Sequence, residues 1–105
     1  MSDVRNLPAE LTIYAVRDAA EQGLGWLSQL DADAGDAPLQ IAADGVEEVD
    51  AAGVQLLIAL SRSLAARGRR LQLLQPSPVL QRALACLGAA ALLGDAAPAA
   101  SETAA

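Results

Sequence analysis

The residues best suited to chemistry lie in the segment 44–55. It contains four carboxylates, those of Asp44, Glu47, Glu48 and Asp50. Asp50 directly precedes a stretch with helical spacing, where an Asp at the N-cap accepts a hydrogen bond from an early amide. The backbone N–H groups of Ala51, Ala52 and Gly53 would then point outward, where an anion could bind. A plain helix cap is the competing interpretation, and it is favoured over a dedicated anion site.

The residue inventory excludes most enzymatic chemistry. The chain has no histidine, and Cys86 is its only cysteine, so a Ser/His/Asp triad, a Cys/His pair and a His-containing zinc site are all impossible. It has neither a lysine nor a Gly-rich phosphate loop to bind a nucleotide. The aspartates of 31–36 lack the spacing of a calcium-binding loop. We expect a protein that is not an enzyme and binds no metal or cofactor, with Cys86 buried and inert.

Composition limits the partners. The 105 residues suit one domain, carry a net charge of −6 and include only 2% aromatic residues. Nucleic acid and anionic lipid both require a basic surface, and base stacking requires aromatic side chains, so neither is expected as a partner. Arginines interrupt every long apolar run, and the N-terminus lacks the order of a signal peptide. We therefore expect a cytoplasmic protein without direct membrane insertion.

The charges are unevenly distributed along the chain. Residues 1–50 contain eleven acidic residues and two arginines, whereas residues 51–94 contain five arginines and no acidic residue. Four of these arginines form a cluster at Arg62, Arg67, Arg69 and Arg70. The cluster has two interpretations, a docking site or cations that stabilise the negative end of a helix. Arg69 and Arg70 are expected to extend into solvent from the edge of a sheet.

Periodicity and turn residues predict alternating strands and helices. Strands are expected at 11–16, 39–43 and 71–75, because these runs are apolar or β-branched. Helices are expected at 18–31, from Asp50 to a stop at Gly68, and from an N-cap at Ser77 onward. Residues 94–105, rich in alanine, are expected to form a disordered tail. This order predicts an α/β domain with parallel strands.

The segment 46–57 and the later strand and turn at 71–78 resemble the STAS domain, a family named for sulfate transporters and anti-sigma factor antagonists. The resemblance covers residues 7–93 and is strongest to small stand-alone bacterial members encoded with chemotaxis or signalling genes. It implies a STAS-like fold, in which a mixed, mostly parallel sheet of about four strands carries helices on one side. Residues 1–6 would then be a flexible terminus or a short first strand around 4–7.

The resemblance also implies a regulatory role with one departure. In the family, a Ser or Thr after the motif's Asp is phosphorylated, and the added charge changes whether a partner docks. That position is Ala51, so the chain has no phospho-acceptor there, and an Asp that commonly ends the preceding strand is replaced by Ala42. Docking at this surface would then be constitutive. Its expected residues are Asp44, Glu47, Glu48, Asp50, Ala51, Val54 and Gln55.

The implied partners are proteins of two kinds. A kinase-like anti-sigma factor or a chemotaxis or signalling protein would bind a non-enzymatic regulatory module. Alternatively, the chain is the cytoplasmic STAS subunit of a bacterial phospholipid-trafficking ABC transporter and holds its permease. In either case we expect a monomer or a weak homodimer.

Overall fold

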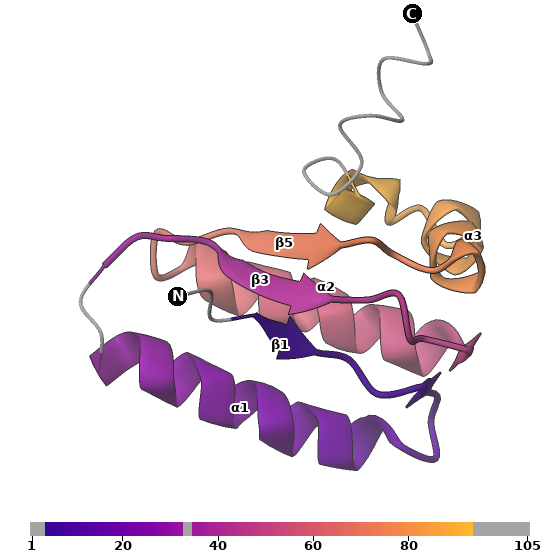
Figure 1. Cartoon of the computed structure of the whole chain (residues 1–105), viewed down its shortest axis with the longest axis horizontal. Coiled ribbons are helices and arrows are strands. Elements are labelled where there is room, and N and C mark those ends of the chain that lie inside the picture. The colour runs from indigo at the N-terminus through magenta and orange to yellow at the C-terminus, as the bar shows by residue number, and fades with distance from the viewer. Residues whose placement is uncertain (1–3, 33–34, 94–105) are drawn as a thin grey trace, which may run out of the picture.

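The computed structural model describes residues 4–32 and 35–93 (Figure 1). Short strands alternate with three α-helices. In chain order the elements are β1 (Arg5–Asn6), β2 (Glu10–Leu11), α1 (Val16–Ala32), β3 (Leu39–Ala42), β4 (Glu48–Val49), α2 (Ala51–Ala65), β5 (Leu71–Leu74), α3 (Pro78–Cys86) and the 3-10 helix η1 (Ala90–Leu93). The expected first strand around 4–7 is therefore present as β1. The tail at 94–105 lies outside the described residues.

The strands pair in two parallel sets. One has the order β1-β3-β5, with Ile41 between Arg5 and Leu73, and the other pairs β2 with β4. Parallel strands need crossover connections, which α1 and α2 supply. This confirms the predicted α/β fold, although the short strands form two small sheets where about four strands were expected in one.

The core lies between the sheet and α2. Side chains along β3 and β5 alternate between the two faces of the sheet. One face carries the buried residues Leu39, Ile41, Leu71 and Leu73, and the other carries half-buried residues. On that second face, the side chain of Gln40 donates a hydrogen bond to Gln72 at 2.8 Å. Helix α2 lies behind β3 and β5 in Figure 1, and α1 runs beside it. The face with large apolar side chains is thus the one that the helices cover.

The strand predicted at 11–16 is shorter in the structure, where β2 ends at Leu11. Residues 12–15 form a turn, closed by a 2.9 Å hydrogen bond from the amide of Ala15 to the carbonyl of Thr12. The β-branched and aromatic residues Ile13 and Tyr14 are 60% and 91% exposed. Their strand propensity is overridden because the amide of Ile13 donates to the Asp50 carboxylate instead of to a neighbouring strand.

The helix ends follow the predicted signals. Ser77 caps α3 by accepting a hydrogen bond from the Leu80 amide, and Pro78 occupies the first turn. Gly68 has a φ of 72°, the left-handed conformation expected of a residue that stops α2. These two helices therefore begin and end where local chemistry indicates.

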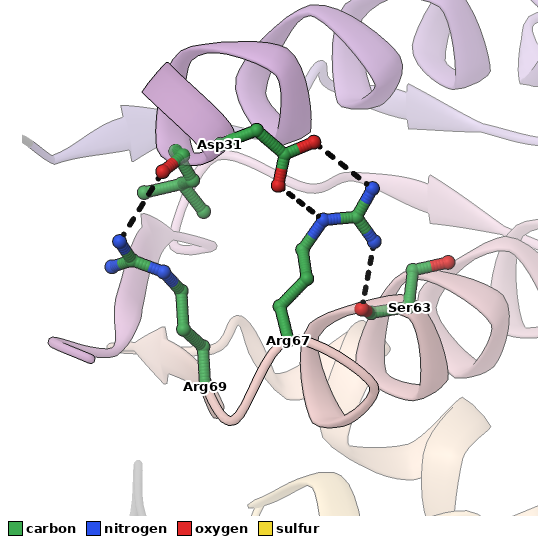
Figure 2. Close-up of polar contacts among 5 residues, drawn as sticks. Asp31, Ser63, Arg67 and Arg69 are labelled. Carbon is green, nitrogen blue, oxygen red and sulfur yellow. Dashed lines mark hydrogen bonds and ion pairs between the residues drawn. The ribbon is translucent and has the colours of Figure 1, made fainter. Parts of the chain in front are cut away.

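The arginines after α2 hold the end of α1 (Figure 2). Arg67 forms an ion pair with Asp31 at 2.7 Å and also donates to the Ser63 carbonyl in the last turns of α2. Arg69 is only 5% exposed, and its guanidinium donates to the carbonyls of Ala37 at 2.8 Å and Leu30 at 3.4 Å. The expectation that Arg69 extends into solvent is therefore wrong, because backbone carbonyls left free after α1 attract it inward.

Candidate functional site

Asp50 organises the start of α2. Its Oδ1 accepts a hydrogen bond from the Gly53 amide at 3.1 Å, and its Oδ2 accepts one from the Ile13 amide at 3.0 Å. Its own amide donates to the carbonyl of Leu11 at 3.2 Å. One side chain thus caps the helix and fixes the turn that precedes α1. The carboxylate already accepts a hydrogen bond from the Gly53 amide at the helix start, so the geometry favours the cap over an anion site.

Gly53 allows α2 to approach β2 closely. A Cβ at this position would lie 2.1 Å from the carbonyl oxygen of Leu11, which is a backbone atom. Only a residue without a side chain fits at this distance. Asp50 and Gly53 therefore have two different structural roles. The Asp50 carboxylate caps α2, and the missing side chain at Gly53 permits the backbone contact with β2.

A shallow hollow of about 520 Å³ lies beside this helix start. Its lining combines four carboxylates with four less polar residues: Glu10, Thr12, Tyr14, Glu47, Glu48, Val49, Asp50 and Val79. Glu10 and Glu48 are register partners on adjacent parallel strands, which places like charges side by side. A binding partner with cationic and apolar groups would complement this surface.

The structure brings together most of the predicted docking residues. Glu47 and Glu48 are exposed and Asp50 is half-buried at the hollow, while Ala51 and Gln55 are exposed on the first turns of α2. Asp44 is exposed in the turn after β3. Val54 is 1% exposed and packs in the core, so it supports the start of α2 from within.

Several residues of this surface were not found from the sequence. Glu10, Thr12, Tyr14 and Val79 reach the hollow from β2, the following turn and α3. The pairing of β2 with β4 brings Glu10 there, and it involves only two residues of each strand. Such a short pairing leaves no pattern in the sequence, although the strong exposure of Tyr14 could have been suspected from its place just before a helix.

The expectation that Cys86 is buried is wrong. The thiol is exposed at the end of α3, where we expected a buried side chain. The helix turns its Leu80 and Leu84 toward the core, and a residue two positions after Leu84 necessarily lies on another face. Among residues 4–32 and 35–93, no group of three His, Cys, Asp or Glu residues could hold a metal ion.

The Asp50 carboxylate makes stability depend on pH. The hydrogen bond from Ile13 is the largest cause that lowers the pKa of Asp50 below its usual 3.8, with Gly53 contributing and desolvation opposing. A lowered pKa means that the stabilisation is complete above pH 3.8 and is lost as pH falls through the folded-state value. We expect Asp50→Asn to lower the thermal midpoint at pH 7 and to differ less from the native protein as pH falls below 3.8.

Thermal unfolding followed by circular dichroism at several pH values tests this expectation. Asp31 has a similarly lowered pKa because of Arg67, so Asp31→Asn is the matched variant for a carboxylate that does not cap a helix. A difference in thermal midpoint between the native protein and Asp50→Asn that stays constant from pH 7 to pH 2 would contradict stabilisation by the ionised Asp50 carboxylate.

The described residues form a parallel α/β fold in which Asp50 caps the exposed start of α2. Comparison with known families gives its class: the family model described as "Mlab, STAS domain" matches residues 4–94. The chain therefore belongs to the STAS domain family. No curated protein and no solved structure matches it. No helix within the described ranges is long and apolar enough to cross a membrane.

Proposed function

We propose that this chain is a constitutive protein-binding module that docks a cytoplasmic partner through the start of α2 and the adjacent acidic hollow. The observation that carries the proposal is Ala51, which is exposed as the first residue of α2. The phospho-acceptor of the family is expected at this position. A methyl group cannot accept phosphate, so docking would not be switched off by charge at this point.

The chemistry of the hollow supports a partner with a complementary surface. Its carboxylates favour arginine or lysine, and Tyr14, Val49 and Val79 add apolar area between them. Contacts between charged surfaces accelerate association and weaken with salt. A kinase-like anti-sigma factor or another signalling protein is the preferred partner, and an ABC permease is the alternative.

Titration calorimetry tests the proposal with two probes from the same genome: a purified kinase-like anti-sigma factor and a detergent-solubilised ABC transporter without its STAS subunit. We expect one of them to bind the native chain. Ala51→Glu should weaken that affinity at least about tenfold, because the longer side chain blocks the close approach that a methyl group allows.

Ala65→Glu is the matched control, since this exposed alanine lies at the other end of α2. It should leave the affinity within about twofold of native. Equal affinities for the native chain and Ala51→Glu, or no binding to either probe, would contradict the proposal.

A further inference from the structure

An apolar surface lies away from the acidic hollow, where α1 and α2 run side by side. Leu24 of α1 is 66% exposed there, although it is a large apolar side chain. It borders a cavity of about 190 Å³ that is lined by both helices and by Leu7 and Pro8, which follow β1. An apolar cavity of about 150 Å³ accommodates a benzene-sized group, so this one can receive a large apolar side chain.

Small residues keep this cavity open. Gly23 of α1 faces Leu60 of α2, and a Cβ added to Gly23 would still lie 3.9 Å from the nearest atom of Leu60. Ala20, Ala59 and Ser63 also line the space, and none of them is long enough to fill it. The chain thus places an exposed leucine beside an unfilled apolar cavity, and within one copy the leucine does not fill it.

The direction of the two helices limits how a second copy could cover this surface. Both helices follow parallel strands and run in the same direction (Figure 1). A second copy related by a two-fold axis perpendicular to the helices would run in the opposite direction, so that its α1 lies antiparallel on α1 of the first copy.

Two charges on α1 complement each other in this arrangement, and they indicate that a second copy covers the surface. Arg17 precedes Leu24 by seven residues and Asp31 follows it by seven, so all three lie on one stripe of α1. Asp31 is 54% exposed at its side chain, even while paired with Arg67. When the axis passes by Leu24, Arg17 of each copy faces Asp31 of the other.

We propose that a second copy of this chain docks on the surface between α1 and α2, with Leu24 of each copy entering the cavity of the other. The contact is isologous, because the same residues are used on both sides. It goes beyond the proposed function, since it uses the sides of α1 and α2 and leaves Ala51 and the acidic hollow free.

Cysteine cross-linking tests the geometry. Leu24→Cys in a Cys86→Ser background should form a disulfide-linked dimer under mild oxidation, because a two-fold axis brings residue 24 close to its own copy. Leu87→Cys in the same background is the matched control, since Leu87 is 50% exposed on a different helix. Cross-linking at residue 87 as fast as at residue 24 would overturn the proposal.

Sedimentation equilibrium of the full chain tests the energetics. We expect a monomer–dimer equilibrium in which Leu24→Gln and Arg17→Asp each raise the dimer Kd at least about tenfold, and which weakens as salt increases. Leu87→Gln should leave the Kd unchanged. A chain that stays monomeric at every concentration, or a dimer that Leu24→Gln does not weaken, would show that another molecule or only solvent meets this surface.

Discussion

Gly53→Ala is expected to lower the free energy of unfolding by about 3 kcal/mol or more. The added Cβ would overlap the carbonyl oxygen of Leu11 at 2.1 Å and come within 2.9 Å of its carbonyl carbon. Both are backbone atoms, so no side-chain rotation relieves the overlap. Either α2 or β2 must move, which disturbs the hydrogen bond from the Asp50 amide to Leu11 and the cap that Asp50 makes to Gly53.

Urea denaturation followed by circular dichroism measures the effect. Gly23→Ala is the matched control, because it makes the same change at a buried helical position with room for the methyl group. It should stabilise the chain by up to about 1 kcal/mol. If both variants change stability equally, the close contact between α2 and β2 is not what requires glycine at residue 53.

Arg69→Met should lower the free energy of unfolding by about 2 to 3 kcal/mol, since a hydrogen bond from a charged donor contributes about 1.5 to 3 kcal/mol. Methionine keeps much of the apolar stem but removes the guanidinium that joins the Leu30 and Ala37 carbonyls. The end of α1 and the segment before β3 would lose their common partner.

Fluorescence of Trp26, the only tryptophan, reports unfolding from within α1. Arg62→Met is the control, because Arg62 is an exposed arginine of α2. The free energy of unfolding of this variant should stay within about 0.5 kcal/mol of the native value. A loss in Arg69→Met no larger than in Arg62→Met would contradict the structural role of Arg69.

The long amphipathic elements could be predicted from the sequence, and the short pairings could not. Helices α2 and α3 carry both an apolar period and an N-cap, so their starts at Asp50 and Ser77 were predictable from local chemistry. Strand β4 has two residues and lacks any periodic signal. Its pairing with β2 is fixed by tertiary contacts, which local patterns do not contain.

The same distinction applies to the candidate site. The carboxylates of 44–50 and the exposed Ala51 follow directly from the segment that resembles the STAS motif. Tyr14 and Val79 line the hollow only in the folded chain, because the turn after β2 and the first turn of α3 both border it. The inward position of Arg69 cannot be predicted from the local sequence, because its charge favours solvent and the fold alone brings it near the carbonyls of Leu30 and Ala37.

The most direct test of the docking surface is an amide NMR titration of the labelled chain with whichever probe binds in calorimetry. The shifts should cluster at residues 10–14, 44–51 and 55, and around Val79, while the amides near Leu24 stay unchanged. Shifts confined to α1, or to the face of the sheet that carries Gln40 and Gln72, would place the partner elsewhere and contradict the account.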